Sequence, residues 1–196
     1  MKIEPVTLTG RIVRLEPLSE AHISGLAKVG LDEKIWRYMR YVKVETAEQL
    51  AAWVRELLDL QACGTDLPFA VIHQASGEPI GSTRYLNIDP LNRSLEIGGT
   101  WYGLDYQRTQ VNTECKYLLL KHAFETLECV RVWFKTDLRN QHSQRALERL
   151  GVVKEGVLRN HMILPDGYIR DSVVYSLLPK EWPQVKMSLE GRLAPE

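Results

Sequence analysis

The chain has 196 residues, and its 25 basic and 25 acidic side chains give no formal net charge at pH 7. This balance excludes the strongly basic surface of a typical nucleic-acid-binding protein and favours a small molecule or a protein as the partner. A hydrophobic fraction of 44% with 26% charged residues is that of a folded globular chain rather than a disordered one. The length suits one α/β or α+β domain with a short tail.

Cysteine and histidine usage argues against a disulfide framework or a metal site. Cys63, Cys115 and Cys129 are odd in number and widely spaced, so we expect reduced thiols that pack as small buried hydrophobes. The five His residues show no metal-ligand spacing. The start MKIEPVTLTGR lacks the apolar core of a signal peptide, and no stretch approaches ~18 consecutive apolar residues. We therefore expect a cytoplasmic protein with no membrane partner.

The N-terminal part predicts a strand followed by two capped helices. Residues 10–18, GRIVRLEPL, alternate apolar and polar side chains as a strand does. Ser19 is placed to cap a helix over 20–30, and Thr46 is placed to cap a second helix. The second helix has apolar side chains at helical spacing, namely Leu50, Trp53, Val54, Leu57 and Leu58.

Three strands are predicted next, as an antiparallel meander. Residues 68–74 and 79–88 flank a turn over 75–78, in which Gly77 supplies the unusual backbone dihedral. The strand 94–102, SLEIGGTWY, is expected to pair next.

The C-terminal part predicts a strand-helix-strand crossover and a closing hairpin. Helical spacing over 111–127 is followed by strand alternation over 130–136, so the strands near 98 and 133 should be parallel neighbours. A short helix over 141–150 comes next, and Pro165-Asp166-Gly167 marks the turn of a last hairpin. Residues from about 186 onward are typical of a loose tail, and no linker divides the chain.

This order of elements resembles the GNAT superfamily of N-acetyltransferases over residues 8–180, with 181–196 as a C-terminal tail. Three segments show the resemblance: TGRIVRLEPLSEAH, YQRTQVNTECKYLLLKHAFE and NQHSQRALERLGVVKEGVLR. The first and third are most similar to the RimJ/RimL-type branch, whose members acetylate protein N-termini or small amines. The resemblance implies an α/β (α+β) fold with a mixed, mostly antiparallel sheet, a splayed parallel pair and flanking helices. It also implies acetyl-CoA as cofactor and a primary amine as acceptor.

The loop before residue 111 matches the family's pyrophosphate fingerprint, Q/R-x-x-G-x-G/A, only in part. Gln107 fits, but Gln110 and Asn112 occupy the two small positions. A Gln110 side chain that points away leaves its amide free, and Asn tolerates left-handed geometry well. Because a helix N-terminus binds anions through its amides, we expect phosphate contacts from Gln107, Arg108, Thr109, Gln110, Val111, Asn112 and Thr113. An ordinary capped helix that binds no phosphate is the alternative.

The consecutive glycines in SLEIGGTWY predict a bulge or a close approach by a ligand. The resemblance implies that the pantetheine arm of the cofactor lies between this strand and the one near 133, bonded by Gly98, Gly99 and Thr100. A backbone amide there would polarise the thioester carbonyl. A simple strand bulge is the alternative.

The helix over 141–150 has Asn140 as its predicted N-cap and a Ser on its inward face. Many relatives have a Tyr four residues before the position of Gly151, placed to protonate the departing thiolate, whereas this chain has Leu147. In RimJ/RimL-type relatives a Ser at the position of Ser143 is the proposed donor. The resemblance therefore implies that Ser143 protonates the thiolate and that Asn140 also bonds the cofactor arm. A Ser that only bonds a backbone group is the alternative.

The general base and the acceptor wall are the least defined parts of the predicted site. Glu96, acting through a water, is the candidate base, and a strand carboxylate paired with Lys or Arg is the alternative. Aromatic and apolar residues that could border the acceptor, or simply pack in the core, are Trp36, Tyr38, Met39 and Tyr168. His161 and Asp171 flank the closing turn and could border the same site.

The sequence favours an enzyme that transfers acetyl directly, without an acyl-enzyme intermediate. Gln110 and Leu147 keep open a catalytically weak CoA-binding regulatory module. A protein-interaction scaffold without cofactor is the third hypothesis, and a homodimer is as compatible with the sequence as a single subunit.

Overall fold

The computed structural model describes residues 1–41 and 44–194, which form a single mixed sheet between two layers of helices. Within these residues the sheet has eight strands in the order β1-β2-β3-β4-β5-β6-β8-β7. Their bounds are β1 Leu8–Thr9, β2 Val13–Pro17, β3 Leu67–His73, β4 Pro79–Asp89, β5 Ser94–Tyr102, β6 Arg131–Asp137, β7 Val153–Ile163 and β8 Ile169–Leu177. Only β5 and β6 pair in parallel among the described strands, so the predicted fold class is confirmed.

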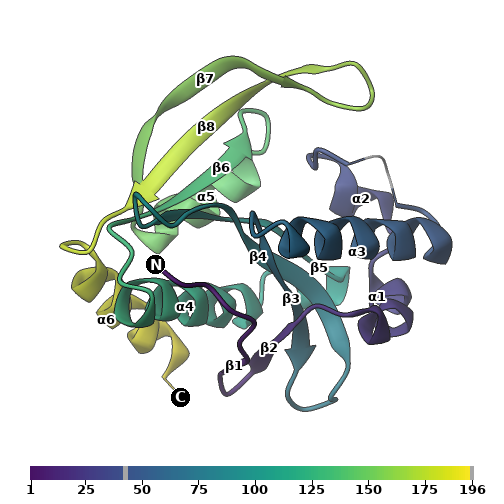
Figure 1. Ribbon diagram of the computed structural model, residues 1–196, viewed down its shortest axis with the longest axis horizontal. Helices are drawn as coiled ribbons and strands as arrows, with labels where there is room; N and C mark the ends of the chain where they lie inside the picture. The colour runs from purple at the N-terminus through teal and green to yellow at the C-terminus, as the bar shows by residue number, and fades with distance from the viewer. Residues whose placement is uncertain (42–43, 195–196) are drawn as a thin grey trace.

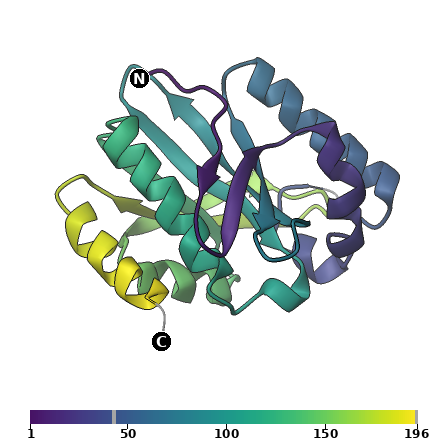
Figure 2. The same ribbon diagram turned by 90° about the horizontal axis from the view of Figure 1, so that it is seen from below.

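The helices cover the two faces of the sheet separately. Figure 2 shows α4 and α6 on one side of the strands and α1 and α3 on the other. The bounds are α1 Ile23–Val29, α2 Glu33–Trp36, α3 Ala47–Ala62, α4 Val111–Lys121, α5 Gln141–Leu150 and α6 Trp182–Leu193, with short turns η1 Glu20–His22, η2 Leu104–Tyr106 and η3 His122–Thr126. Each layer encloses its own apolar core: α4, α5 and α6 pack on one, and α1, α2 and α3 pack on the other. None of the described helices is long and apolar enough to cross a membrane.

Local sequence signals account for most of these boundaries. Thr46 Oγ1 accepts the amide of Gln49, whose side chain bonds back to the Thr46 amide, so α3 begins at a capping box. Gly77 has a φ of 71° in the turn between β3 and β4, and Gly151 ends α5 with a φ of 90°. The predicted meander, crossover and closing hairpin are all confirmed.

Three details differ from the sequence-based expectations. The expected loose tail is instead α6, because Trp182, Val185 and Leu189 are spaced to bury one face against α4. The helix predicted over 111–127 is α-helical only as far as Lys121 and then widens into a π turn. Cys63 is exposed rather than buried, whereas the other two cysteines lie in the core as expected.

A buried carboxylate fixes α4 to the N-terminal edge of the sheet. Glu114 is 4% exposed and accepts the amides of three consecutive residues, 11–13, at 2.9, 2.7 and 2.7 Å. Gly10 leaves the space that this carboxylate needs, since a Cβ there would lie 2.5 Å from Glu114 Cδ. The start of α4 is therefore anchored against the loop before β2.

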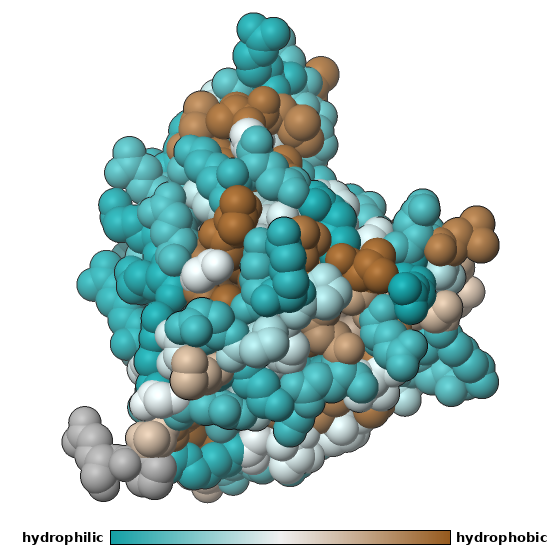
Figure 3. Space-filling model, turned by 90° about the vertical axis from the view of Figure 1, so that its left-hand side faces the viewer, coloured by the Kyte–Doolittle hydropathy of each residue, from teal (hydrophilic) through white to brown (hydrophobic). Residues whose placement is uncertain are grey.

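The hairpin of β7 and β8 projects from the body of the molecule (Figure 1, top). β7 is an edge strand of the sheet, and all of its residues are partly or fully exposed. Figure 3 shows hydrophobic side chains among hydrophilic ones on this projection. The exposed apolar residues of the two strands are Val153, Val157, Leu158, Ile163 and Ile169.

Candidate active site

The parallel strands β5 and β6 part from each other after a short ladder. The pairs that join them are Ser94–Arg131, Leu95–Val132 and Glu96–Trp133. β5 continues to Tyr102 and β6 to Asp137, with no further pair between these described strands. The predicted splay is confirmed, and the stretch of β5 beyond Glu96 has an open edge on this side.

A bulge interrupts β5 within its open stretch. The register against β4 shifts between Ser82 and Arg84, so that Thr83 faces both Gly99 and Thr100. Gly99 has a φ of 56°, in the left-handed region that favours glycine. The bulge predicted from the two glycines is therefore present.

A buried arginine lies directly against this bulge. Arg84 is 2% exposed, its Nη1 is 3.0 Å from Asp66 Oδ2, and its Nη2 donates to the Tyr41 hydroxyl. Its Nε has no hydrogen-bond acceptor among the described residues and would be 2.8 Å from a Cβ at position 99. The guanidinium therefore fills the space beneath Gly99.

Two amides at the start of α4 are without an acceptor. Thr109 Oγ1 accepts the Val111 amide at 3.2 Å, and the Glu114 amide donates to the Gln110 carbonyl at 2.9 Å. For the amides of residues 112 and 113, no acceptor is present within the described part of the chain. These are the orphan donors of a helix N-terminus, which is the arrangement that binds anions.

The side chains of the loop leave this helix end uncovered. Gln110 Nε2 donates to the Arg192 carbonyl in α6 at 2.9 Å, so its side chain points away from the amides. Gln107 Nε2 donates to the Tyr102 carbonyl at 3.1 Å. The left-handed residue of the loop is Arg108, with a φ of 61°, and not the Asn at 112, which is part of the regular helix. Both large residues of the fingerprint therefore leave the amides of residues 112 and 113 free. The Gln110 side chain is turned toward α6, and Asn112 is an ordinary helical residue.

The short helix α5 begins as predicted. Asn140 Oδ1 accepts the Ser143 amide at 3.1 Å, which makes Asn140 the N-cap. Ser143 is half-buried, and its hydroxyl has no partner among the described residues. Leu147 is 7% exposed and packs in the core. Of these side chains, only the Ser143 hydroxyl is able to give a proton.

Glu96 lies where the two strands part, with its carboxylate beside Gly98. The residue is 3% exposed, Asn87 Nδ2 donates to its Oε2 at 2.7 Å, and Lys135 Nζ is 3.5 Å from the same oxygen. A Cβ on Gly98 would stand 3.1 Å from Glu96 Oε1. Burial raises the pKa of this carboxyl above its ordinary value, against the opposing effects of Lys135 and Asn87. Glu96 is thus both a paired carboxylate and a basic one.

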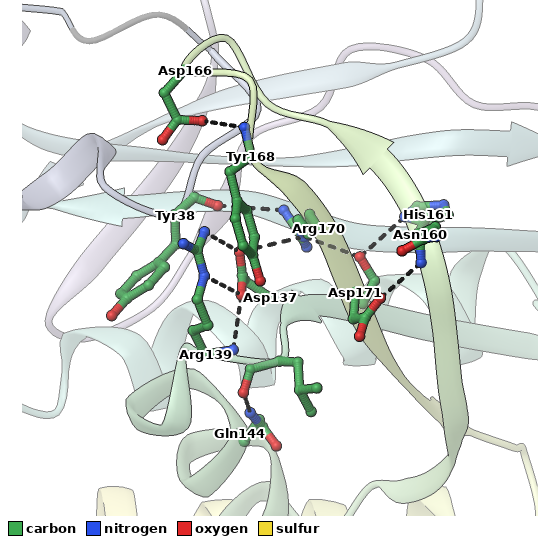
Figure 4. A network of polar contacts seen from close by, with 12 residues as sticks. Tyr38, Asp137, Arg139, Gln144, Asn160, His161, Asp166, Tyr168, Arg170 and Asp171 are labelled. Carbon is green, nitrogen blue, oxygen red and sulfur yellow. Dashed lines mark hydrogen bonds and ion pairs between the residues drawn. The ribbon is translucent and has the colours of Figure 1, made fainter.

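A charged cluster joins the end of β6 to the β7–β8 hairpin (Figure 4). Asp137 accepts from Arg139 Nε at 3.1 Å and from its Nη2 at 3.0 Å, and Arg170 Nε lies 4.0 Å from the same carboxylate. The Arg139 guanidinium stacks 3.3 Å from the centre of the Tyr168 ring, and Arg170 Nη1 donates to the Tyr38 carbonyl at 3.3 Å. The structure therefore brings together Tyr38 and Tyr168, which the sequence placed on one acceptor wall.

Trp36 and Met39 lie elsewhere. Trp36 is 2% exposed, donates from Nε1 to the Gly30 carbonyl at 2.7 Å, and packs against the rings of Trp53 and Trp101. Met39 is half-buried beside the same core. Trp36 is therefore a core residue in this conformation and offers no surface to an acceptor.

The hairpin also brings His161 and Asp171 to one open hollow of about 810 Å³, which residues 157–161 line with Asp171. His161 Nδ1 is 3.0 Å from Ser172 Oγ, and Asp171 Oδ1 accepts the Asn160 amide at 2.7 Å. Burial, with the positive charges of Lys135 and Arg170, lowers the pKa of His161. Among the described residues, no group of His, Cys, Asp and Glu side chains is arranged to hold a metal ion.

Sequence reasoning missed Lys135, Arg139 and Arg170, which supply the positive charge of this region. Lys135 and Arg170 occupy positions within β6 and β8, where no local motif marks them. Arg139 adjoins the predicted cap residue, and only the folded hairpin places it over an aromatic ring. Lys116, on α4, was also missed: its Nζ donates to Thr100 Oγ1 at 2.8 Å.

Comparison with known proteins gives the family. Residues 13–153 match the family described as acetyltransferase (GNAT) domain. The chain is 32% identical over 130 residues to the Bacillus subtilis (strain 168) protein YdaF, provisionally named a ribosomal N-acetyltransferase, covering 66% of this chain and 67% of that one. It is 25% identical to the ribosomal-protein-serine acetyltransferase of Escherichia coli (strain K12), over 80% of this chain and 87% of the relative. A crystal structure from T. thermophilus, provisionally described as an acetyltransferase, is 42% identical with a TM-score of 0.90, covering 99% of this chain and 100% of that one.

The family match in sequence and the similarity in fold both point to an acetyltransferase. The same chain has the open β5 edge, the bulge and the free amides of α4 described above. The chain belongs to the GNAT family of acetyl-CoA-dependent N-acetyltransferases, in its RimJ/RimL-like branch.

Proposed function

We propose that the chain transfers acetyl from acetyl-CoA to a primary amine by direct attack of the amine on the thioester in a ternary complex. The observation that supports this most strongly is the open edge of β5 beyond Glu96, which ends next to two acceptor-free amides at the start of α4. Those amides, of Asn112 and Thr113, hold the pyrophosphate with the help of the helix dipole. Arg108, exposed beside them, adds a positive charge.

The open edge of β5 suits an extended arm. Backbone groups of Gly98, Gly99 and Thr100 bond the arm as a neighbouring strand would. In the bulge, an amide directed at the thioester carbonyl stabilises the negative charge that develops on its oxygen. Asn140, which already caps α5, lies on the other side of the opening at the end of β6 and contacts the same arm.

The state of the cysteine thiols supports direct attack by the amine rather than transfer through an acyl-cysteine intermediate. Burial raises the pKa of Cys115 to about 12 and that of Cys129 to about 11, so both are protonated thiols at neutral pH. The exposed Cys63 follows the end of α3, and its thiol has no hydrogen-bond partner among the described residues that could activate it. None of these thiols is therefore suited to form an acyl-enzyme intermediate.

Two side chains move the protons. Glu96 accepts the proton of the attacking amine through a water, and its raised pKa makes it a stronger base than an exposed carboxylate. Ser143, whose hydroxyl has no partner within the described residues, protonates the departing thiolate. Leu147, at the position of the family's Tyr, cannot do so.

The acceptor we favour is the α-amine of a protein N-terminus, with small-molecule amines as the second class. An α-amine with a pKa near 8 is roughly 10 to 20% neutral at pH 7, whereas a Lys amine is far below 1% neutral. The ribosomal names of the relatives YdaF and the Escherichia coli enzyme point to the same class. Tyr38, Tyr168 and the Arg139 between them border the path by which such an acceptor reaches Glu96.

Thiol release from acetyl-CoA tests this proposal. Peptides with a free N-terminal α-amine should release thiol faster than matched peptides whose α-amine is acetylated and whose only amine is Lys. Small-molecule amines are tested as a third group of acceptors. Thermal stabilisation by acetyl-CoA without thiol release on any amine would support the CoA-binding module that Leu147 permits, and no stabilisation at saturating CoA would overturn cofactor binding altogether.

A further inference from the structure

Lys116 is a buried lysine for which the described structure provides no acidic partner. The residue is 8% exposed, and within the described residues its side chain makes one hydrogen bond, to Thr100 Oγ1 at 2.8 Å. Thr100 Oγ1 is in turn 2.7 Å from Thr83 Oγ1. An ammonium group has three donors, so two N–H groups of Lys116 are uncommitted within the described residues.

The position of Lys116 on α4 directs it away from the N-terminal edge of the sheet. Successive residues of an α-helix turn by about 100°, so Lys116 is roughly 200° from Glu114 around the helix axis. Glu114 faces the loop before β2, where it accepts three amides. Lys116 consequently lies on the opposite flank, where it meets Thr100 in the open stretch of β5.

Without a ligand this arrangement is unfavourable. Removing an ammonium group from water has a large free-energy cost unless hydrogen bonds or an opposite charge replace the hydration. One threonine hydroxyl replaces little of it, and burial accordingly lowers the pKa of Lys116 to about 8. A ligand that presents hydrogen-bond acceptors at this place would satisfy the remaining N–H groups.

We propose that Lys116 Nζ donates a hydrogen bond to an amide carbonyl of the pantetheine arm, from the α4 side of the open β5 edge. This rests on the proposed function, which places that arm along residues 98–100. Thr100 and Thr83 orient the amine, because their hydroxyls form a chain from β4 to Nζ. Lys116 is thus a cofactor-binding residue that acts on the arm and not on the phosphates.

Calorimetric titration of the full chain distinguishes these two parts of the cofactor. The probes are CoA and adenosine 3′-phosphate 5′-diphosphate, which keeps the pyrophosphate but has no pantetheine arm. The variant is Lys116→Met, which removes the amine and keeps an unbranched side chain one atom shorter. The matched control is Lys121→Met, at an exposed lysine of the same helix. We expect Lys116→Met to weaken CoA binding about tenfold, as loss of a hydrogen bond from a charged donor does. Its affinity for the probe without the arm, and both affinities of Lys121→Met, should match the wild type.

Each other outcome is decisive. Equal CoA affinity in wild type and Lys116→Met overturns the assignment while leaving the proposed function intact, and an equal loss for both probes moves the contact from the arm to the phosphates and overturns it too. Failure of the wild type to bind CoA overturns the proposed function itself. Should Lys116→Met not fold, Thr100→Val, which removes the hydroxyl that orients the amine, provides the comparison, with a selective loss for CoA expected.

Discussion

The Arg84 guanidinium packs directly against Gly99, so that a Cβ on the glycine would lie 2.8 Å from Arg84 Nε. The φ of 56° at Gly99 independently disfavours any other residue. The bulge of β5 is therefore held in place by the protein alone. In the proposed function an amide of this bulge stabilises the oxyanion, and its orientation would then be set by the protein before the thioester binds.

Replacing this glycine should disable catalysis before it unfolds the protein. We expect Gly99→Ala to destabilise the fold by about 1–2 kcal/mol from backbone strain and to lower kcat by at least about tenfold, because Arg84 and the bulge must move apart. Gly77→Ala is the control: its φ of 71° gives similar strain, but a Cβ there meets nothing within 4 Å. Thermal unfolding measures the stability of both variants, and steady-state kinetics measures their kcat. Equal kcat in Gly99→Ala and Gly77→Ala would show that the bulge has no part in catalysis.

Glu96 should determine the acid limb of the pH profile. Burial raises its pKa above the ordinary value of 4.5, so wild-type kcat/KM should fall as the pH drops through that raised value and the base becomes protonated. Glu96→Gln should lower kcat/KM about 100-fold at pH 7 and steepen the requirement for high pH, since only amines that are already neutral can then react. The exposed Glu78, in the turn before β4, gives the matched Glu→Gln control. An unchanged profile in Glu96→Gln would exclude this carboxylate as the base.

The sequence predicted the elements well because their signals are local. Alternation in the strands, the cap at Thr46 and the glycines at 77 and 151 each depend on a few adjacent residues. The exposed position of Cys63 had no such signal, because burial at the end of a helix depends on its neighbours in space. The same is true of the polar cluster: Arg139 and Tyr168 are brought together only by the register of β6, β8 and β7.

The prediction of a loose C-terminal tail was wrong for a different reason. Trp182, Val185 and Leu189 are spaced as one face of a helix, but a position near the chain end is a weak guide to disorder when the partner surface is far away in sequence. In the folded chain Trp182 Nε1 donates to Glu125 at 2.9 Å and α6 packs along α4. α6 also supplies the carbonyl that draws the Gln110 side chain away from the predicted phosphate site. The wrongly assigned segment thus contributes to the candidate site.

Ser143→Ala should separate proton donation from cofactor binding. The Ser143 hydroxyl has no partner in the described structure and its amide, not its side chain, completes the cap with Asn140, so the fold should change little. We expect kcat to fall about tenfold, since general acid catalysis is lost while the CoA thiol remains acidic enough to leave as an anion. The Kd for CoA should change less than about twofold in the same titration. A proportional loss of affinity and kcat would identify Ser143 as a binding residue instead.

The carboxylate of Glu114 should be a major source of stability. Glu114→Gln replaces an oxygen that accepts backbone amides with an NH2 group that faces the same donors, and we expect a loss of about 3 kcal/mol. Glu190→Gln, at an exposed position of α6, keeps an amide oxygen that can accept from the Tyr117 hydroxyl and should cost less than about 0.5 kcal/mol. Urea unfolding at pH 7 measures both changes. Similar values for the two variants would mean that the loop before β2 is held by other contacts.

Lys116 should lower the stability of the cofactor-free protein in a pH-dependent way. Its pKa is about 8 in the fold, against an ordinary value of 10.5, so between these values the unfolded chain binds more protons and stability rises with pH. Below about pH 8 the full penalty, of order 3 kcal/mol, is present, and above about pH 10.5 it vanishes. Lys116→Met should therefore be more stable than the wild type at pH 7, and the difference should shrink as the pH approaches 10.

Urea unfolding of both proteins at several pH values without CoA measures that difference directly. Lys121→Met, exposed on the same helix, should track the wild type at every pH. A stability difference between Lys116→Met and the wild type that stays constant from pH 7 to pH 10 would show that the ammonium is solvated or paired in the fold, and that burial does not depress its pKa.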